Sequence, residues 1–255
     1  NNFLKKVYNK GLSKMDYIIA NSSYVKNEII NKYKLSKDIT VISRGIDTNF
    51  FNQDMIKPKE LNSLKEKINF DKSKKIVLFP GRITPWKGQL DFLRIIERFK
   101  NRNYIFYFAG GITSKSYLEE INKRIDKFGL NNTCKVIGKL NIYELRALIN
   151  LSNIVLSLPI VPEGFGRTVS ESLSMNKIVL AFNYGGVKDQ LNNLDNFFKI
   201  EPKNYDELYY KIIELEKFSQ VEINNLNKYS RNHIIENFSL TNMVKSYEKF
   251  YNSIL

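Results

Sequence analysis

The hydrophobic pattern of this chain alternates short, continuous apolar runs with longer segments in which apolar side chains recur at helical spacing. The runs between residues 75 and 200 are Lys75–Phe79, Tyr104–Phe108, Lys135–Ile137, Ile154–Leu158 and Ile178–Ala181. Helical spacing follows at about 87–99, 115–128 and 167–175. Strands that alternate with helices predict a parallel, doubly wound sheet, so the expected fold class is α/β and Rossmann-like. Such sheets bind ligands at the carboxyl ends of their strands.

The first 50 residues carry a smaller pattern of the same kind. Its predicted elements are helical spacing over residues 3–15, a strand at Asp16–Ala20, a helix at Tyr24–Tyr33 and a strand at Ile39–Ile42. Asn21 or Ser22 has the side chain to cap that helix. After a turn at Ser43–Asp47 the periodicity is lost until about residue 60, and helices dominate again from Tyr205 to the end.

The composition is that of a globular protein in a reducing compartment. The 255 residues suffice for one large domain or for one and a half small ones, and 43% of them are hydrophobic. No apolar run approaches the roughly 20 residues that a membrane span needs. A single cysteine, Cys134, excludes an internal disulfide. The chain opens with Asn1 and not with a methionine, so we expect a piece of a longer protein.

A net charge of +14 is the strongest global feature. It suits a nucleic acid, an anionic membrane surface or a phosphate-bearing substrate, and it also follows from a genomic bias toward Asn, Lys, Ile and Tyr. The sequence has no RRM, KH or C₂H₂ signature and its basic residues are scattered, so nucleic acid is not an expected partner. Cysteine and histidine do not cluster at metal-binding spacing, so no metal is expected.

The stretch Pro162–Glu171 joins a predicted strand to a predicted helix through a glycine-rich turn. Gly164 and Gly166 let a ligand approach the backbone, and the amides at the start of the helix form a natural anion site. Glu163 and Glu171 bracket the turn and are expected to face one crevice. The alternative is a surface loop with two solvated acids.

A second strand-to-helix connection, Gly81–Gly88, carries two cations. Arg82 presents a planar fork of donors that matches phosphate oxygens, and Lys87 places a compact charge at the expected helix start. A solvated basic loop is the alternative in a chain with 40 Lys and Arg residues. Other strand ends carry Gly110–Gly111, Gly138–Asn141 and Gly185–Gly186. Together these segments predict one crevice with a cationic, phosphate-binding edge and an acidic edge.

Four segments resemble the retaining nucleotide-sugar glycosyltransferases of family 4, which have the GT-B fold. EGFGRTVSES at residues 163–172 resembles the family's E-x7-E motif, and the loop at residues 81–88 resembles its GR-x4-KG signature. The run CKVIGKLNIYELRALINLSNIVLSLP resembles its nucleobase slot. The turn Asn183–Val187 is also similar, but Lys188–Asp189 stands where the family usually has Pro-Glu. The resemblance covers nearly the whole chain.

The resemblance also implies a division of the chain. Residues 1–50 look like the end of the family's N-terminal acceptor domain and its linker, so a remnant of a second Rossmann-like domain is expected there. Residues 51–236 resemble the donor-binding domain, and residues 237–255 resemble the C-terminal helix that crosses back to the N-terminal domain. Because most of the acceptor domain is missing, this fragment alone is expected to be inactive.

The activity implied by the resemblance is transfer of a hexosyl group from a nucleotide diphosphate sugar to a glycan or lipid-linked acceptor, with retention at the anomeric carbon. The implied setting is synthesis of cell-surface polysaccharide, lipopolysaccharide or glycolipid, in the cytoplasm or peripherally at the inner face of the plasma membrane. Neither a cofactor nor a metal is implied, because protein cations stabilise the leaving diphosphate. A nucleotide-sugar epimerase of the same fold is an alternative, but the acid/base residues that it needs are not found.

The resemblance assigns catalytic roles to Glu163, Arg82 and Lys87: the two cations hold the diphosphate, and the carboxylate offsets positive charge on the sugar. Glu171 accepts hydrogen bonds from the ribose hydroxyls. The implied substrate-binding residues are Gly81, Arg82, Lys87, Gly110, Gly111, Lys139, Leu140, Glu163, Gly164, Phe165, Gly166, Arg167, Thr168 and Glu171. The only histidine, His233, is expected to be structural and to lie in the terminal helix, far from the motifs.

Overall fold

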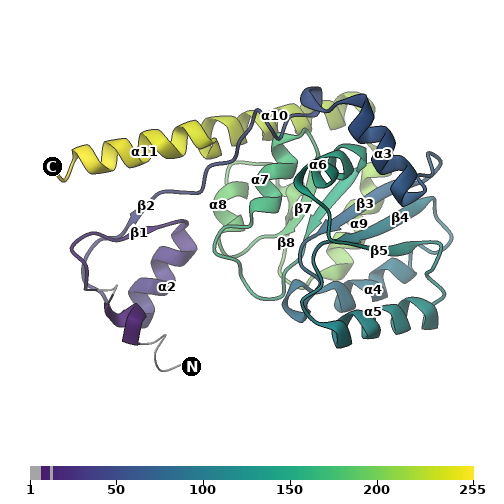
Figure 1. The fold of residues 1–255 in the computed structure, drawn as a ribbon, viewed down its shortest axis with the longest axis horizontal. Helices are drawn as coiled ribbons and strands as arrows, with labels where there is room; N and C mark the ends of the chain where they lie inside the picture. The colour runs from purple at the N-terminus through teal and green to yellow at the C-terminus, as the bar shows by residue number, and fades with distance from the viewer. Residues whose placement is uncertain (1–6, 12–13) are drawn as a thin grey trace.

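The structure is a computed structural model that describes residues 7–11 and 14–255. Its main body is a six-stranded parallel sheet in the order β5-β4-β3-β6-β7-β8 (Figure 1). The strands are β3 (Lys75–Pro80), β4 (Tyr104–Ala109), β5 (Cys134–Gly138), β6 (Ile154–Ser157), β7 (Ile178–Phe182) and β8 (Lys199–Ile200). The predicted parallel α/β sheet is confirmed, to within a residue at each end of the predicted strands. The pattern does not predict β8, because two residues are too few to show a period.

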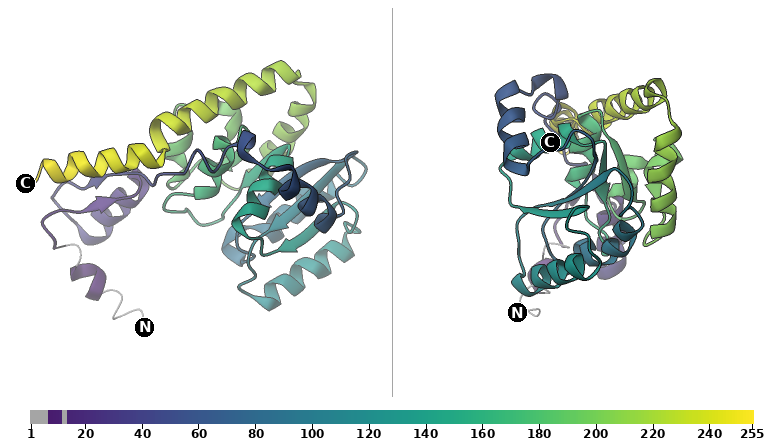
Figure 2. Two further views of the ribbon diagram at one scale, coloured as in Figure 1. Left: turned by 45° about the horizontal axis from the view of Figure 1, so that its top comes forward. Right: turned by 90° about the vertical axis from the view of Figure 1, so that its right-hand side faces the viewer.

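Helices cover both faces of this sheet, which is why its strands are apolar nearly throughout. One face carries α3 (Pro58–Ile68), α6 (Ile142–Leu151), α7 (Arg167–Ser174) and α10 (Gln220–Phe238), and the other carries α4 (Gln89–Glu97), α5 (Lys115–Lys127) and α9 (Tyr205–Glu214) (Figures 1 and 2). Buried phenylalanines fill the interior. The ring of Phe79 meets those of Phe92 and Phe108 edge to face, with centroids 5.9 and 5.6 Å apart.

Helices α3 and α4 begin at other residues than the pattern indicates. Helix α3 begins at Pro58, inside the stretch without periodicity, because proline at the first helical position is already set for a helix. The helix expected from about Lys87 begins instead at Gln89. Gly88 adopts a left-handed φ of 83°, which ends the 3₁₀ turn Pro85–Lys87 and starts α4. Lys87 therefore projects from a turn and not from the helix itself.

A small N-terminal unit contains β1 (Ile19–Ala20), α2 (Ser23–Tyr33) and β2 (Thr40–Val41), and its two strands are parallel. The predicted helix is confirmed. Ser22, one of the two expected caps, accepts a hydrogen bond from the amide of Val25 at 3.1 Å. In Figure 1 this unit lies beside the large domain, on the side of α8 (Val187–Leu191).

Two chain segments connect the unit to the large domain, and they run side by side. The amide of Ile46 donates to the carbonyl of Phe238 at 2.8 Å, and the amide of Leu240 donates to the carbonyl of Ile46 at 2.9 Å. Between these bonds Ser239 is extended, with φ −72° and ψ 155°, and caps the next helix. The single terminal helix that was expected is therefore two helices, α10 and α11 (Leu240–Asn252).

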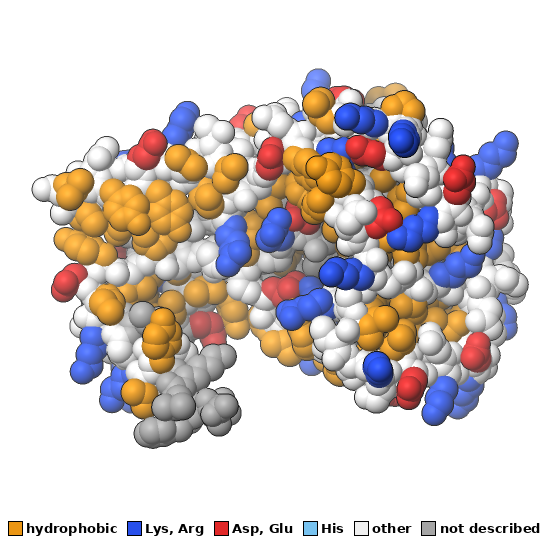
Figure 3. Space-filling model, viewed as in Figure 1, with side chains coloured by type: hydrophobic (Ala, Val, Ile, Leu, Met, Phe, Trp, Pro, Cys, Tyr) orange, Lys and Arg blue, Asp and Glu red, His pale blue; other side chains and the backbone are white. Residues whose placement is uncertain are grey.

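Helix α11 reaches back over the N-terminal unit (Figure 2). The ring of Phe250 meets that of Tyr17 edge to face, with centroids 6.0 Å apart. Apolar side chains gather along this helix (Figure 3). Val244 and Tyr251 are among the exposed residues of α11. Gly45 permits the crossing, because a Cβ at this position would lie 2.5 Å from the Cα of Leu240.

Candidate functional site

The crevice expected at the carboxyl ends of the strands falls at the switch point of the sheet. The chain adds β4 and β5 on one side of β3, whereas β7 and β8 lie on the other side, beyond β6. The adjacent strands β3 and β6 therefore send their connections in opposite directions, which is the arrangement in which parallel sheets form a ligand crevice. The loop at residues 81–88, here called the cationic loop, follows β3, and the glycine turn at residues 162–166 follows β6. Both predicted motifs thus border the same crevice.

Lys87 and Glu163 join the two sides of this crevice through an ion pair of 2.8 Å. Their side chains are only 10% and 19% exposed, so water screens the pair weakly. The sequence predicts a cationic edge and an acidic edge, and the structure places these edges in direct contact. Loss of either partner would leave a poorly solvated charge, which is costly.

The two cations of the cationic loop lie around Trp86, the only tryptophan of the chain. The Nζ of Lys87 is 4.8 Å and the Cζ of Arg82 is 5.1 Å from the ring centroid. Gly81 makes room for the lysine, because a Cβ there would lie 3.3 Å from its Cε. Arg82 is exposed and forms no ion pair within the part of the chain that the structure describes. Its guanidinium is available to an anion in the crevice.

The glycine turn leads into a helix without a cap. Gly166 has a left-handed φ of 83° and precedes α7 with no side-chain cap. Among the described residues, the backbone amides of residues 165–168 have no protein acceptor. These free amides and the positive end of the helix dipole form an anion site. Phe165 contributes only its amide, because its buried ring packs 6.1 Å from that of Phe238.

A second glycine turn, Gly185–Gly186, packs behind the first. The amide of Gly186 donates to the carbonyl of Glu163 at 2.8 Å. A Cβ on Gly186 would lie 2.2 Å from the carbonyl oxygen of Gly164, and a Cβ on Gly185 would lie 2.7 Å from that of Glu163. The motif at residues 183–187 therefore supports the backbone of the glycine turn.

Glu171 lies in α7 and is 6% exposed. An ion pair of 2.9 Å joins it to Arg167, whose side chain is exposed at the start of the same helix. Burial raises the pKa of Glu171 above its usual value, and the guanidinium of Arg167 opposes this shift. Thr168, next to Arg167, is partly buried in the first helical turn. The two glutamates of the motif thus differ, since Glu163 pairs across the crevice and Glu171 pairs within its own helix.

The remaining predicted residues lie on the β5 side of the switch point. Gly110 is a packing position, because a Cβ there would lie 2.0 Å from the carbonyl oxygen of Gly81. Gly111 borders open space, with nothing within 4 Å of a Cβ. Lys139 and Leu140 follow β5 at the edge of the sheet. Glu163, which follows β6, stands on the opposite side of the switch point.

Gln190, in α8, is a residue that the sequence reasoning missed. Its fully buried side chain donates to the carbonyls of Phe165 and Gly166 and accepts from the hydroxyl of Ser170. These bonds occupy two carbonyls of the glycine turn on the side that faces the core. The amides of residues 165–168 remain free. No pattern marks this glutamine, and its place just after Gly185–Gly186 is the only signal in the sequence.

The expectation that His233 lies far from the motifs is wrong. Its Nε2 is 2.9 Å from the carbonyl oxygen of Gln190, directly behind the glycine turn. Its ring packs against Phe238, with centroids 5.6 Å apart. Burial lowers the pKa of His233, and the contact with the Gln190 carbonyl opposes this shift. The packing of α10 on α7 brings these distant segments together.

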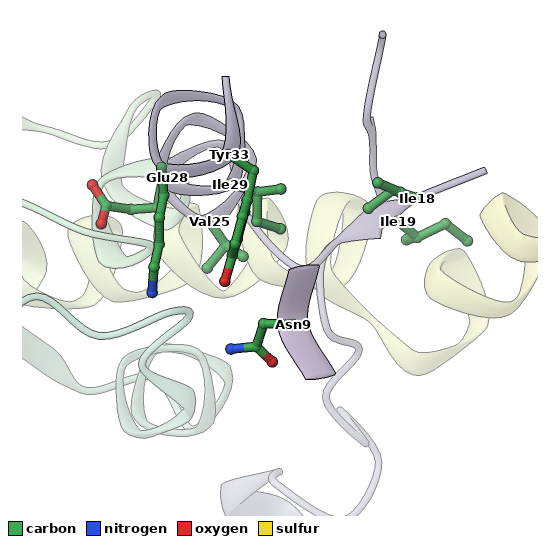
Figure 4. A pocket seen from close by; sticks show the side chains of 8 residues that line it. Asn9, Ile18, Ile19, Val25, Glu28, Ile29 and Tyr33 are labelled. Carbon is green, nitrogen blue, oxygen red and sulfur yellow. The ribbon is translucent and has the colours of Figure 1, made fainter. Parts of the chain in front are cut away.

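A separate cavity of about 400 Å³ lies in the N-terminal unit (Figure 4). It is lined by Asn9, Ile18, Ile19, Val25, Glu28, Ile29, Lys32 and Tyr33. Most of these side chains are apolar, and Glu28 is the only acid among them. The described residues that line the cavity therefore include no pair of acidic groups for catalysis.

The described residues contain no group of three His, Cys, Asp or Glu side chains placed to hold a metal ion. Within the same residues, none of the helices combines the length and the hydropathy required of a membrane span.

Comparison with known proteins gives two family matches. The family described as "Glycosyl transferases group 1" matches residues 62–233, which is more than half of the chain. The family described as "Glycosyltransferase Family 4" matches residues 1–50. The first match covers the switch-point crevice and both of its motifs.

Individual relatives agree with these matches. The chain is 26% identical to an uncharacterized glycosyltransferase of Methanocaldococcus jannaschii, over 100% of this chain and 64% of that protein. It is also 26% identical to a trehalose synthase of Pyrococcus horikoshii, over 78% of this chain and 49% of that protein. The chain thus spans between about half and two thirds of the length of these curated relatives.

Solved structures share the fold. A glycosyltransferase from Rickettsia africae superimposes with a TM-score of 0.88 and 30% identity, over 100% of this chain and 67% of that chain. The Anabaena protein HepE in complex with UDP and glucose superimposes with a TM-score of 0.82 and 21% identity, over 93% of this chain and 63% of that chain.

Proposed function

Since this chain belongs to the glycosyl transferases group 1 family, we propose that it is the donor-binding part of a hexosyltransferase. The donor is a nucleotide diphosphate sugar, and the acceptor is a glycan or a lipid-linked glycan. The observation that carries this proposal is the switch-point crevice, where Arg82 and Lys87 lie opposite the free amides of residues 165–168. Guanidinium, ammonium and helix-end amides are the groups that proteins use for phosphates.

Each group acts on a charge that develops as the bond between sugar and diphosphate breaks. The diphosphate gains negative charge, which the two cations and the free amides stabilise from fixed positions. The sugar gains positive charge, which the carboxylate of Glu163 offsets. The ion pair between Glu163 and Lys87 keeps both groups at the crevice before the donor binds. These cations take the part of a metal, so we propose that the reaction requires none.

The finer details of the proposal rest on the resemblance to family 4. They are retention at the anomeric carbon, a ribose contact from Glu171 and a nucleobase contact from the backbone of Lys139 and Leu140. The complex of HepE with UDP and glucose supports a nucleotide-sugar donor. The net charge of +14 suits peripheral attachment to an anionic membrane at the cytoplasmic face, in synthesis of cell-surface glycans.

Nucleotide binding tests this proposal directly. UDP, GDP and ADP are titrated separately while the fluorescence of Trp86 is followed, since this single tryptophan lies next to both cations. We expect one of the three to change the fluorescence and to raise the unfolding temperature by mass action. The matched nucleoside lacks the phosphates and should bind far more weakly.

Two outcomes would contradict the proposal. A folded chain that binds none of the three nucleotides at millimolar concentration would exclude a donor site. Salt-sensitive binding of random oligonucleotides in preference to nucleotides would favour a nucleic-acid-binding protein.

A further inference from the structure

One hydrogen bond joins the N-terminal unit to the large domain next to the crevice. The backbone amide of Ser23 donates to the Oδ2 of Asp189 at 2.6 Å. Ser23 is the first residue of α2, and Asp189 lies in α8. The carboxylate of one unit therefore occupies the helix start of the other.

The chemistry of the helix end explains this contact. The first amides of a helix have no partner within the helix, and the helix dipole gives them a positive field. Ser22 satisfies the amide of Val25 from within α2. Asp189 satisfies the amide of Ser23 from the other side of the crevice, with a full negative charge. Helix α2 is thus capped jointly by both units.

The docked end of α2 lies against the glycine turn. A Cβ on Gly164 would lie 3.2 Å from the Cγ2 of Val25 and 3.7 Å from the side-chain amide of Asn21. The Oδ1 of Asn21 is buried and has no hydrogen-bond partner among the described residues. Burial, and after it the charges of Glu163 and Tyr24, raise the pKa of Tyr184 to about 12.

Helix α8 holds both sides of this junction. Gln190 binds the carbonyls of the glycine turn, and its neighbour Asp189 binds the start of α2. Residues 189 and 190 therefore connect the turn that carries Glu163 to the unit that covers it.

We propose that Asp189 is a positioning residue that holds the start of α2 against the Glu163 end of the crevice. The position of α2 then sets how open the crevice is where the transferred sugar would lie. The docking itself does not depend on the proposed function, whereas its effect on the sugar rests on that function.

A disulfide trap tests the docking without any ligand. Cysteines replace Val25 and Gly164, since the Cγ2 of Val25 lies 3.2 Å from the Cβ position of Gly164. A sulfur at a γ position of residue 25 can therefore approach a sulfur on residue 164 closely enough to bond. Cys134 is buried, and its raised pKa keeps it out of the exchange. We expect the pair to close rapidly under mild oxidation in the otherwise native chain.

Three further substitutions are each added to the trap. Asp189→Ala removes the acceptor and should slow closure about fivefold, the effect of losing a charge at a helix start. Ser23→Pro removes only the donor, at the helix position that tolerates proline best, and should slow closure equally. Ser23→Ala keeps the amide and should close at the original rate. Equal rates in all four chains, or no closure in any, would overturn the proposed docking.

The effect of Asp189 on sugar binding is measured by comparing the affinities of UDP and UDP-glucose. If GDP or ADP is the nucleotide that binds, GDP-glucose or ADP-glucose takes the place of UDP-glucose. Asp189→Ala should leave the nucleotide affinity within twofold and reduce the additional affinity due to the sugar. Rescue by Asp189→Glu would show that the carboxylate is what matters. Equal loss of both ligands would refute positioning at the sugar end. Absence of nucleotide binding in the native chain would instead refute the proposed function and leave the trap result standing.

Discussion

The two sides of the crevice offer an anion different chemistry. The cationic loop presents the side chains of Arg82 and Lys87, whereas the glycine turn presents backbone amides. The cationic side chains can be replaced while the backbone beneath them stays in place. The amides are held in position by the residues that pack behind them. Gly186 packs against the carbonyl of Gly164, and the side chain of Gln190 donates to the carbonyls of Phe165 and Gly166.

This difference has a consequence for mutants. On the cationic loop, ligand binding and fold stability should separate at Arg82, whose side chain is exposed and forms no ion pair among the described residues. They should separate less at Lys87, which is paired with Glu163. On the glycine turn, ligand binding and fold stability should change together. The buried contacts that hold the amides in position are also part of the packed core. Matched substitutions in the two regions test this separation.

The largest effect is expected from Arg82→Ala combined with Lys87→Ala. Nucleotide affinity should fall by about 2–4 kcal/mol, since each charge-assisted contact is worth ~1.5–3 kcal/mol and the two are not additive. Calorimetry at one fixed salt concentration measures this loss. The unfolding temperature should also fall, because the loss of Lys87 leaves the weakly solvated carboxylate of Glu163 without its partner.

The matched control removes the same charge elsewhere. Lys123→Ala with Lys127→Ala takes two exposed lysines from α5. Unchanged nucleotide affinity in the control and a large loss in the crevice variant would assign the effect to the site. Equal losses in both would mean that net charge alone attracts the nucleotide.

Gly186→Ala should act mainly on stability. Its Cβ would lie 2.2 Å from the carbonyl oxygen of Gly164, so the backbone of the glycine turn must shift. We expect a loss of about 1–3 kcal/mol in the free energy of unfolding, as for other overpacked sites, together with weaker nucleotide binding. Urea denaturation measures the first quantity and calorimetry the second.

Gly111→Ala is the control for this substitution. It also adds one methyl group near the crevice, but into open space, and should change stability by less than about 0.5 kcal/mol. A stable Gly186→Ala protein with normal nucleotide affinity would show that the second glycine turn does not support the first.

The same contrast shows what the sequence can predict. Strands β3 to β7 and the two motifs follow from periodicity and turn chemistry, because each is a local property of the chain. Helix α3 also carried a local signal, Pro58 at its start, as did α6, where Asn141 and Glu144 form a capping box. The bond from His233 to Gln190 links residues that are distant in sequence, and no spacing rule predicts it.

The ion pair between Lys87 and Glu163 likewise joins residues that are distant in sequence. The sequence places both residues at strand ends, but only the order of the strands makes their loops neighbours. The positions of individual site residues were therefore predictable, whereas their pairing was not.

Glu171→Gln should weaken nucleotide binding by about 1 kcal/mol, because a neutral acceptor forms weaker hydrogen bonds than a carboxylate. Stability should not fall at neutral pH, since burial already opposes the charge and raises the pKa of Glu171. A raised native pKa means that protonation favours the folded state as pH falls. At pH 7 the Glu171→Gln variant should therefore be at least as stable as the native chain. Any gain in its free energy of unfolding should shrink as the pH is lowered through the native pKa of Glu171, because the native carboxyl group then becomes neutral as well.

Thermal unfolding between pH 4 and pH 7 checks this sign, and Glu163→Gln serves as the comparison in the same series. A glutamine variant at residue 171 that is less stable at pH 7 would mean that the pair with Arg167 outweighs the cost of burial. Unchanged nucleotide affinity would remove Glu171 from the site.

The smallest effect on the bare nucleotide is expected from Glu163→Gln. The carboxylate pairs with Lys87 at 2.8 Å, so its removal frees that ammonium for phosphate while it leaves the amides of the glycine turn in place. Affinity for the nucleotide should stay within about 0.5 kcal/mol of the native value or improve slightly, because the lost pair and the gained phosphate contact offset each other. Affinity for the nucleotide sugar should fall, because the carboxylate that we propose to bind the sugar hydroxyls is then replaced by an uncharged amide. Calorimetry with the nucleotide and with the nucleotide sugar, on both Glu163→Gln and Glu171→Gln, measures these affinities.

If both variants lose the bare nucleotide equally, the two glutamates do not divide nucleoside and sugar between them. If neither variant loses either ligand, the carboxylates are not part of the binding site, and the crevice binds through its cations and amides alone.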